Sequence, residues 1–585
     1  MNQDILMPLF SKHLKVRNIV SIDVETYGVE NDFYLGGVYS DNGFELFTEK
    51  ELLQEELLQR KYVGDVYIVA TNLGFDFTAI YYGSKHWEKF KIIMVGSRMV
   101  EVVYEHQRGK IVFIDSLNYA QFSVKVMGEI LGIPKLEAPS CLGKIPKNKK
   151  EFNELAIYNK RDCEVTYKFV KFLQEGFNKL GGTMKITVAS TAMDTFRRKY
   201  LRFPLKKEVA RLEKPHLREL MFKGYYGGRT EVFKRGKISN MKMYDINSLY
   251  PSVMLNDFPN PNYARHQYQP HKNILQFEGM SDVLLTTHDN YYPYLPVRKE
   301  KLLFPNGTIR GVYTHTALRK AIEQGYNVKK IYESLYYKKT FYPFKDYVTD
   351  LYDLRLKYKK EKSPMEIVVK LLLNSLYGKF AQRKMNDIEF FDLNTASDDF
   401  LDAFHNDEEL QAVMTKDNKG FITTDRQCNQ AFVFPMLSAY TTSYAQDRLF
   451  YFMEKYKAHY TDTDSIVTNK TMPESNKLGD MKVEYDINKG ILVKPKMYMF
   501  ETPNKIIVKM KGLPRATKEQ FKDILLGNKV RYTKFSKLKE SVRRNMKPNT
   551  IYEMEKSVSL EDNKREWESG FDADSLQDSE PLIVD

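Results

Sequence analysis

The chain has 585 residues, 42% of them apolar and 13% aromatic, so it should form several packed domains and is not a disordered protein. Lysine and arginine number 90 against 76 acidic residues, and the resulting net charge of +14 suits a polyanion such as nucleic acid. No run of about 18 apolar residues is present to cross a membrane. Ile5–Phe10 is too short and too interrupted by Pro8 for a secretion signal, and three scattered cysteines argue against a disulfide framework.

The N-terminal third alternates strand-like and helix-like patterns. Strands are predicted at Arg17–Thr26, Asp65–Thr71 and Lys110–Asp115, and a long helix is predicted over Glu151–Leu180. This mixture indicates an α/β domain.

Carboxylates recur on these predicted elements. Asp23 and Glu25 are two positions apart on a strand and therefore share a face, Asp76 follows the second strand, and Tyr158 and Asp162 share a face of the long helix. Four convergent carboxylates would bind two divalent ions that activate water for phosphodiester hydrolysis, with Tyr158 orienting the water. A D-x-E pair is more often plain surface charge. The apolar setting VSIDVET favours the metal interpretation, because buried carboxylates need partners.

The middle of the chain begins with a glycine-rich loop, Gly224–Arg229, and a strand predicted at Ile238–Ile246. A basic, helical stretch at Lys345–Lys379 should be interrupted at Pro364. Further on, His459–Asn469 is typical of two short strands joined by a tight acidic turn.

A second acidic set is distributed over these elements. Asp245 ends the strand at Ile238–Ile246, and Asp462 and Asp464 lie in the acidic turn, with Asp245 and Asp464 219 positions apart. Carboxylates from two distant segments are what a two-ion site requires when it joins a triphosphate to a primer hydroxyl. The alternative is structural, because aspartate is favoured in turns whatever its function.

Three further patterns involve basic or acidic residues. Lys370, Asn374 and Tyr377 form one helical stripe that suits a nucleotide, with the ammonium toward phosphate and the ring toward base or sugar. Lys494, Lys496 and Tyr498 alternate along one face of a predicted strand, as a grip on a primer backbone or as a basic edge strand. Glu561–Asp585 contains nine carboxylates and is predicted to be a partly disordered tail with no assigned function.

Together these segments resemble family B DNA polymerases, and in particular their protein-primed branch, over residues 18–500. Three segments are similar to the family's exonuclease motifs, in the family's order: Asp23-Val-Glu25, Asn72-x-x-Phe75-Asp76 and Tyr158-x-x-x-Asp162. Three more are similar to polymerase motifs A, B and C: Asp245-x-x-Ser-Leu249-Tyr250-Pro251, Lys370-x-x-x-Asn374-Ser-x-Tyr377-Gly378 and Tyr460-x-Asp462-Thr-Asp464.

The resemblance implies roles for individual residues. Asp245 and Asp464 would bind the ions for synthesis with Asp462 as a secondary acidic partner, and Asp23, Glu25, Asp76 and Asp162 would bind those for editing, two Mg²⁺ (or Mn²⁺) ions per site. Lys370 would hold the triphosphate, Tyr250 would exclude a ribose 2′-hydroxyl, and Tyr377, Asn374 and Leu249 would complete the nucleotide pocket. The expected contacts to DNA are Tyr225, Gly227 and Gly228 of a Y-x-G-G element, Lys496 and Tyr498 of a K-x-Y element, Asn72, Phe75, Ser116, Leu117, and Lys144 as the lysine between the second and third exonuclease motifs.

The resemblance also implies a multidomain fold, α/β and α+β, with a ribonuclease H-like 3′→5′ exonuclease before a right-hand polymerase. Lys370 lies 119 positions after Pro251 and Tyr460 lies 82 after Gly378, intervals long enough for the branch's two terminal-protein regions. The expected domains are the exonuclease at 1–188, the palm at 189–260 and 431–512, the two insertions at 261–344 and 383–430, the fingers at 345–382, and a thumb with an acidic tail at 513–585. The stretch after Gly512 does not match the short thumb of the phage enzyme that typifies the branch.

The implied function is DNA-directed DNA synthesis on a linear viral or mobile-element genome, with strand displacement and proofreading. The implied partners are template and primer DNA, dNTPs and a terminal protein whose hydroxyl starts the strand, and the enzyme should act as a monomer in a host cytoplasm, away from membranes. Two alternatives stay open. One is a compact family B enzyme that extends ordinary primers, and the other is a basic DNA-binding protein whose carboxylates are structural.

Overall fold

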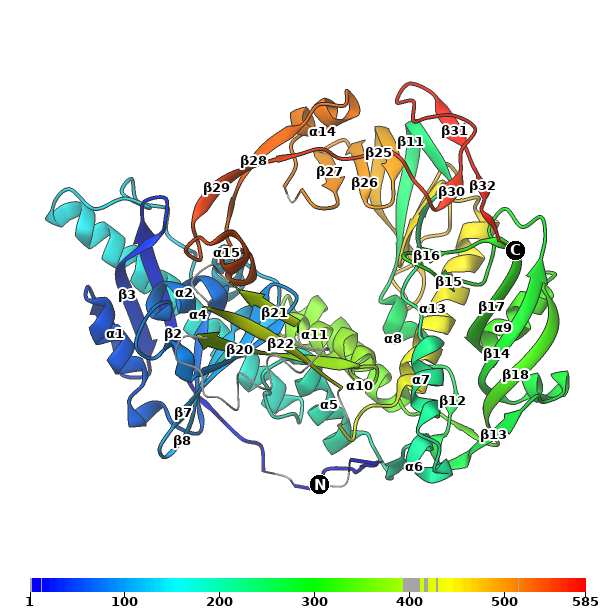
Figure 1. Cartoon of the computed structure of the whole chain (residues 1–585), viewed down its shortest axis with the longest axis horizontal. Helices are drawn as coiled ribbons and strands as arrows, with labels where there is room; N and C mark the ends of the chain where they lie inside the picture. Colours follow the sequence, from blue (N-terminus) through cyan, green and yellow to red (C-terminus); the bar gives the residue numbers. More distant parts are fainter. Residues whose placement is uncertain are drawn as a thin grey trace.

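The computed structural model describes residues 3–11, 13–392, 411–414, 419–427, 430–513 and 515–584. Figure 1 shows an N-terminal sheet (mostly blue) on one side and the sheets of the middle and later chain (green to orange) on the other. Helices α5 (Val188–Lys199), α10 (Lys345–Lys360) and α11 (Met365–Lys379) lie between them. Among the described residues no helix is long and apolar enough to cross a membrane.

A ten-stranded sheet organises the N-terminal part, in the order β21-β22-β20-β6-β7-β8-β5-β2-β3-β4. Its parallel centre consists of β2 (Asn18–Tyr27), β5 (Val66–Ala70) and β8 (Gly109–Asp115), which confirms the three predicted strands. They are apolar because both faces of the central strands are covered. The predicted long helix is α4 (Lys149–Lys179), packed on β2 and β3. The other strands are β3 (Asp32–Ser40), β4 (Gly43–Phe47), β6 (Phe90–Val95), β7 (Arg98–His106), β20 (Lys384–Asp392), β21 (Gln411–Met414) and β22 (Lys419–Gln427).

Strands β20 to β22 thus come from the stretch 383–430 that was predicted to be a second terminal-protein region, yet they extend the N-terminal sheet through β20 and β6. Residues 393–410, 415–418 and 428–429 of that stretch lie outside the described residues.

An eight-stranded sheet organises the later part of the chain, in the order β10-β23-β24-β11-β25-β26-β27 with β31 (Leu576–Asp578) beside β11. The strand predicted at Ile238–Ile246 is the end of β11 (Lys234–Ile246), and the predicted acidic hairpin is β23 (Tyr460–Asp462) and β24 (Ser465–Thr468). Helices α8 (Leu249–Val253) and α13 (Pro435–Lys455) pack with this sheet around a shared apolar core. The remaining strands are β10 (Thr230–Val232), β25 (Met481–Lys494), β26 (Met497–Glu501) and β27 (Ile506–Met510).

Residues 264–337 supply helix α9 (His315–Glu323) and four strands of a separate five-stranded sheet. Its order is β13-β18-β14-β17-β33, and the last strand, β33 (Ile583–Val584), comes from the C-terminus and runs parallel to β17. The other strands are β13 (Ala264–Tyr268), β14 (Glu278–Thr287), β17 (Asn306–Thr314) and β18 (Asn327–Tyr337).

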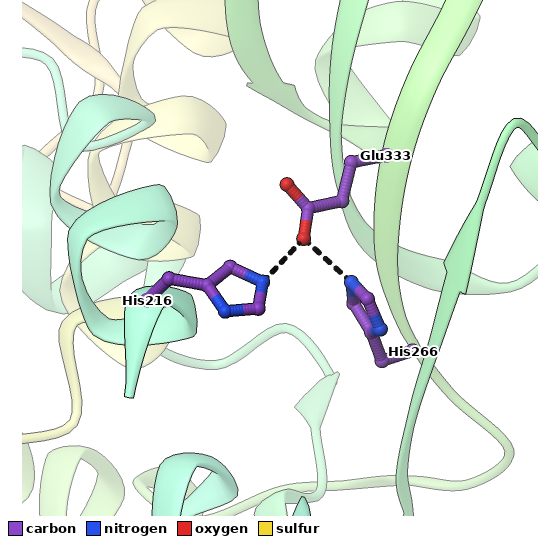
Figure 2. A group of neighbouring side chains, drawn as sticks. All are labelled: His216, His266 and Glu333. Atoms are coloured by element: carbon purple, nitrogen blue, oxygen red, sulfur yellow. Dashed lines mark hydrogen bonds and ion pairs between the residues drawn. The ribbon is translucent and has the colours of Figure 1, made fainter. Parts of the chain in front are cut away.

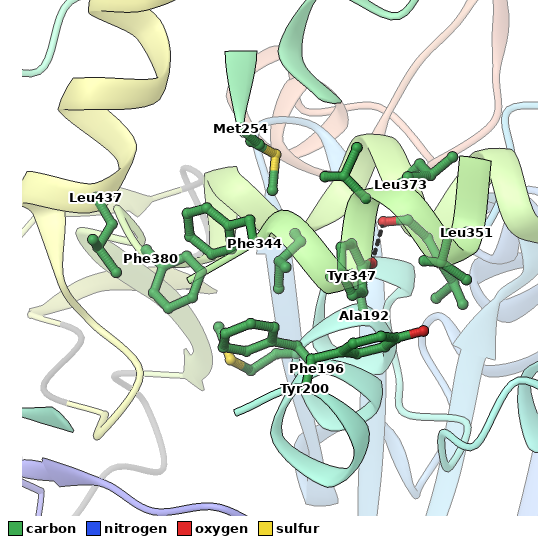
Figure 3. Packing of buried hydrophobic residues seen from close by; sticks show 14 of the residues in the cluster. Ala192, Phe196, Tyr200, Met254, Phe344, Tyr347, Leu351, Leu373, Phe380 and Leu437 are labelled. Atoms are coloured by element: carbon green, nitrogen blue, oxygen red, sulfur yellow. Dashed lines mark hydrogen bonds between the residues drawn. The ribbon is translucent and has the colours of Figure 1, made fainter. Parts of the chain in front are cut away.

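Helices α10 and α11 form a hairpin whose break is at Pro364, as predicted. Figure 3 shows why the hairpin is fixed: Phe344 and Tyr347 at the start of its first arm and Phe380 at the end of its second pack against Phe196 of α5. The Tyr347 hydroxyl also donates to the Leu372 carbonyl at 2.7 Å, so the ring bridges both arms. The exposed face of α11 is thereby held in one orientation.

An arch connects the two sides of the molecule in Figure 1. It consists of α14 (Lys518–Leu525), the hairpin β28 (Val530–Phe535) with β29 (Ile551–Lys556), and α15 (Leu538–Arg544). Its far end contacts the N-terminal domain: the Ile551 amide donates to Val29 at 2.7 Å and the Asn549 side chain donates to the Phe75 carbonyl at 2.9 Å. The segment after Gly512 therefore links the later sheets back to the N-terminal one.

The acidic tail is not disordered up to Val584, so that prediction was wrong. Arg235 of β11, with a fully buried side chain, stacks on Trp567 at 4.2 Å and donates to Ser569 and Gln577. Gly236 has φ +105°, and a Cβ there would lie 1.8 Å from the Ser575 carbonyl oxygen. The acidic composition of the tail predicted that it would be solvated. The tail is instead held by contacts of an arginine and a tryptophan and by backbone pairing.

Arg565 is expected to be the main anchor of this tail. Its side chain is fully buried, lies 3.2 Å from Glu231 of β10, and donates to Ser579 at 2.7 Å. Arg565→Met should destabilise the later sheets by about 3 kcal/mol, because polar groups that it satisfies stay buried. Thermal unfolding measures this, with the exposed Arg544→Met of α15 as the control. Equal melting temperatures for the two variants would contradict an anchoring role.

Two candidate active sites

The first site lies where β2, α2 (Leu73–Tyr81) and α4 meet. The Asp76 carboxylate accepts the Val24 amide at 3.0 Å, which fixes α2 against the strand between Asp23 and Glu25. Asp162 joins them from α4. All four predicted carboxylates come together: burial raises the pKa of each, and neighbouring carboxylates raise those of Asp23, Glu25 and Asp76 further.

The charges in this cluster are only partly compensated. Burial, and then the charges of Asp76, Glu25 and Asp162, raise the pKa of Asp23 well above its usual value. Burial followed by Asp162 raises the pKa of Glu25 to about 7. Glu25 Oε1 and Asp162 Oδ1 are buried without a hydrogen-bond partner among the described residues. Oxygen atoms that are free and mutually repelling are a donor set that fits divalent cations.

The lysine of this site is Lys135, not Lys144. Lys135 Nζ pairs with Asp162 Oδ2 and lies 4.6 Å from the centre of the Tyr158 ring. Lys144 is exposed and has no contact with the cluster among the interactions that the structure shows. Sequence reasoning chose the wrong lysine because both precede α4 in a loop, where spacing does not determine contacts. It also missed Asn159, whose side-chain amide donates to Asp23 Oδ2 at 2.9 Å.

Lys135→Ala is expected to lower the nuclease activity predicted for this cluster about 10–100-fold and to shift its pH profile. The lysine charge holds the pKa of Asp162 down against burial, so without it that pKa rises and the ionised, cation-binding form appears only at higher pH. The acid limb of the activity profile should therefore move to higher pH. Single-stranded DNA degradation measured against pH tests this, with Lys144→Ala as the matched control; an unmoved acid limb would contradict the role.

Residues predicted to hold single-stranded DNA lie beside this cluster. Asn72 adopts a left-handed backbone (φ +70°) at the start of α2, and its amide donates to Asp115 at 3.1 Å. The same carboxylate oxygen accepts the Leu117 amide at 2.9 Å. Asp115, fully buried, thus joins the Asn72 and Leu117 segments, a role that the sequence did not indicate. Ser116 is buried, and Phe75 packs edge-on against Phe535 of the arch at 6.0 Å.

The second site is at the ends of β11 and β24. Asp245 pairs with Ser465 across these strands, and the Ile246 amide donates to the Asp464 carbonyl at 2.8 Å, so Asp245 and Asp464 are neighbours as predicted. Burial, then the charge of Asp245, raises the pKa of Asp464 to about 6. Burial also raises the pKa of Asp245, opposed first by Lys482, 3.3 Å away on β25, which sequence reasoning missed. Like charges held together in a half-buried site fit a divalent cation.

Asp462 is already engaged by side chains. Lys496 Nζ lies 2.8 and 3.0 Å from its two oxygens, and Thr230 donates to it at 2.9 Å. The predicted single strand carrying Lys494, Lys496 and Tyr498 is wrong, because Lys496 has φ +60° in the turn between β25 and β26. The left-handed turn directs Lys496 back to Asp462, and Tyr498 is buried in β26.

The predicted nucleotide residues lie on α8 and α11. Tyr250 and Tyr377 stack with ring centres 4.4 Å apart and planes at 18°. Lys370 and Asn374 are exposed on the same helix as Tyr377, and the Lys370 charge acts on Asp245. Leu249 is buried, so it supports the site from beneath. The arrangement brings motif-B-like residues of α11 to the carboxylates of the sheet.

The glycine-rich loop contacts the acidic turn. The Thr463 amide donates to the Arg229 carbonyl at 2.7 Å. A Cβ on Gly228 would lie 2.8 Å from Thr463, whereas one on Gly227 would meet nothing within 4 Å. Gly228 is thus required for close packing and Gly227 leaves an open backbone surface. Tyr225 is partly buried in the core next to Tyr377.

Known proteins place this arrangement in a family. Residues 140–477 match the family described as DNA polymerase type B, organellar and viral. The chain belongs to this family. A probable DNA polymerase of Podospora anserina is 28% identical over 410 residues, covering 63% of this chain and 33% of that protein. The DNA-directed DNA polymerase of Enterobacteria phage PRD1 is 24% identical over 470 residues, covering 74% of this chain and 79% of that protein.

This type B polymerase chain spans about a third of the length of its fungal relatives, 33% for the Podospora protein and 38% for one of Neurospora intermedia. Its fold is that of the phi29 DNA polymerase solved with primer-template DNA and incoming nucleotides, with a TM-score of 0.70 and 16% identity over 93% of this chain and all of the phage chain. The predicted architecture, an exonuclease-type domain followed by a right-hand polymerase, is confirmed by this match.

Proposed function

We propose that the chain is a DNA-directed DNA polymerase that also removes nucleotides from 3′ ends. The observation that carries the proposal is the presence of two separate acidic clusters in one fold of the type B family. One cluster stands beside the segments of Asn72 and Leu117, and the other stands beside the Tyr250–Tyr377 stack and Lys370. Cation-binding carboxylates with different neighbours favour two phosphoryl-transfer reactions, addition and removal of nucleotides, at the 3′ end of the same strand.

For synthesis, Asp245 and Asp464 would hold the divalent ions, Mg²⁺ or Mn²⁺. When bound, two such ions activate the primer hydroxyl and neutralise the triphosphate charge. Lys482 and Lys370 oppose the rise that burial causes in the pKa of Asp245, which favours its ionised, cation-binding form. The Tyr250 ring stacks on Tyr377 and presents a rigid apolar face, which would sterically exclude a sugar with a 2′-hydroxyl from the nucleotide pocket. Lys370, exposed on α11, would meet the triphosphate.

For editing, Asp23, Glu25, Asp76 and Asp162 would hold the ions that activate water and stabilise the leaving 3′ oxygen. Tyr158, against Lys135, would orient the attacking water. Asn72, Phe75, Ser116 and Leu117 would hold the single-stranded end. Because the Phe75 carbonyl accepts from Asn549 at the far end of the arch, the end-binding segment is also tied to the thumb.

Protein priming is part of the proposal. It is supported by the family-like motif order and by the sheet at 264–337, which occupies the first long interval between polymerase motifs. The second interval supplies β20 to β22 beside the exonuclease sheet. A terminal protein would present a serine, threonine or tyrosine hydroxyl in place of a primer end.

The test uses purified protein, Mg²⁺ and dNTPs in two assays. On a primed template, incorporation should depend on Mg²⁺, and salt-dependent DNA binding without incorporation would leave only the DNA-binding alternative. The second assay supplies a linear template, no primer and the product of a neighbouring reading frame that encodes a small basic protein. A labelled nucleotide joined covalently to that protein supports protein priming. Extension of ordinary primers with no such adduct favours the compact alternative.

A further inference from the structure

A cluster of metal-binding residue types lies apart from both acidic sites. Among the residues that the structure describes, His216, His266 and Glu333 form the one group of three His, Cys, Asp or Glu whose ligand atoms all lie within 4.8 Å of one another. Figure 2 shows the two imidazoles directing ring nitrogens at the same oxygen of Glu333 from opposite sides. The Nε2 distances to Glu333 Oε1 are 2.7 Å from His216 and 2.5 Å from His266.

The three residues come from three different elements. His216 begins helix α7 (His216–Lys223), His266 is on β13 and Glu333 is on the neighbouring strand β18. Glu333 is 117 positions from His216 and 67 from His266, so no local motif could have indicated the group. The two strands are paired in fixed register, with Tyr268 opposite Glu333. Two ligands are therefore positioned by one sheet, and the third is delivered by a helix.

Burial differs across the group in the way that an accessible metal site requires. The side chains of His266 and Glu333 are 3% and 16% exposed, whereas His216 is 45% exposed. Two ligands are thus held by packing, and the third borders solvent, where an ion can enter and a water can complete its coordination. The Tyr268 ring lies 4.5 Å from the His266 ring and its hydroxyl is 3.3 Å from His216 Nε2, which limits the motion of both imidazoles.

We propose that His216, His266 and Glu333 bind one Zn²⁺ ion that clips helix α7 to the sheet of residues 264–337. Two imidazole nitrogens and one carboxylate oxygen are a ligand set that Zn²⁺ accepts with an open fourth position. Zinc–ligand bonds of about 2.0–2.1 Å need ligand atoms roughly 3.3 Å apart, so the present contacts open by less than about 1 Å. Each imidazole then carries its proton on Nδ1, and Nε2 is free to bind the ion.

The position of the clip gives it a consequence for the polymerase site. Helix α7 ends at Lys223, directly before the Tyr225–Gly228 loop that packs on Thr463 of the acidic turn. An ion that binds only the folded arrangement stabilises it by mass action. Occupancy should therefore raise the melting temperature of the part of the chain that contains α7 and β18.

The test is a Co²⁺ titration of the chelator-treated full chain. Asp23, Asp76 and Asp464 are replaced by asparagine in every chain tested, so that Co²⁺ binding at the two acidic sites does not contribute to the absorption. We expect one equivalent of Co²⁺ to give the visible d–d absorption of a four-coordinate site and Zn²⁺ to abolish that absorption by displacement. His216→Ala should weaken Co²⁺ binding at least about 100-fold, and Glu333→Gln should weaken it similarly. His288→Ala, an exposed histidine after β14 in the same domain, is the matched control and should bind as the parent does.

The melting temperature gives a second measurement that does not depend on the visible absorption of Co²⁺. One equivalent of Zn²⁺ should raise the melting temperature of the parent and of the His288→Ala chain and leave that of His216→Ala unchanged. Because His216 lies at the surface, its loss should not prevent folding. Absent four-coordinate absorption, binding that survives both His216→Ala and Glu333→Gln, or a zinc-induced shift in His216→Ala would each overturn the proposal and leave a hydrogen-bonded triad.

Discussion

Asp464→Asn is expected to lower nucleotide incorporation at least about 10³-fold while leaving degradation of single-stranded DNA unchanged. Asparagine keeps the shape of the turn and the Ile246–Asp464 backbone hydrogen bond but removes the charge that would hold an ion beside Asp245. The exonuclease cluster is built on β2, α2 and α4, so it does not share this carboxylate. Primer extension and 3′ end degradation, measured on the same preparation, separate the two activities.

The stability of this variant has an expected sign. Burial and the charge of Asp245 raise the pKa of Asp464 to about 6, so its ionised form is disfavoured in the folded chain. Above that pKa the negative charge lowers stability, and asparagine removes it, so the variant should melt no lower than the parent at neutral pH without added ions. Asp486→Asn on β25, an exposed partner of Lys242 at 3.5 Å, is the control and should keep incorporation. Loss of both activities in a folded Asp464→Asn chain would contradict two independent sites.

Much of the fold follows from local sequence signals. Strand β5 and the middle of β8 are continuous apolar runs, and β2 is buried along most of its length. The break between α10 and α11 is at Pro364, where proline cannot continue the hydrogen-bond ladder. The acidic hairpin of β23 and β24 has the turn composition that predicts it. The carboxylate clusters were also predictable, because two-residue spacing on a strand and four-residue spacing on a helix each fix a shared face.

Contacts between distant segments were not predictable from spacing. Lys135 and Lys144 are both loop lysines before α4, and only the folded chain shows that Lys135 reaches Asp162. The strand pattern at Lys494–Tyr498 failed because a single left-handed residue, Lys496, turns the chain. The prediction of a partly disordered tail failed for a different reason. The anchor Arg565 pairs with Glu231, 334 positions away, so the order of the tail depends on a partner that composition does not reveal.

The combined change Asp23→Asn and Asp76→Asn is expected to lower degradation of single-stranded DNA at least about 10³-fold and to leave incorporation on matched primers intact. Both side chains keep their size, and asparagine at position 76 still offers an oxygen to the Val24 amide. Two of the four charges that would hold the ions are lost, and with them two buried carboxylates whose pKa values are raised by burial and by neighbouring carboxylates. The double variant should therefore be at least as stable as the parent without added ions.

A primer with a mismatched 3′ end makes the consequence measurable. The parent should remove the mismatched nucleotide before extending, whereas the double variant should stall at the mismatch or extend it uncorrected. Asp41→Asn, at an exposed position beside Lys171 in the same domain, is the matched control and should edit normally. Normal editing by the double variant would show that the nuclease active site is not the β2–α2–α4 cluster. Failure of the double variant on matched primers as well, in a chain that melts normally, would show that the acidic clusters act as one site.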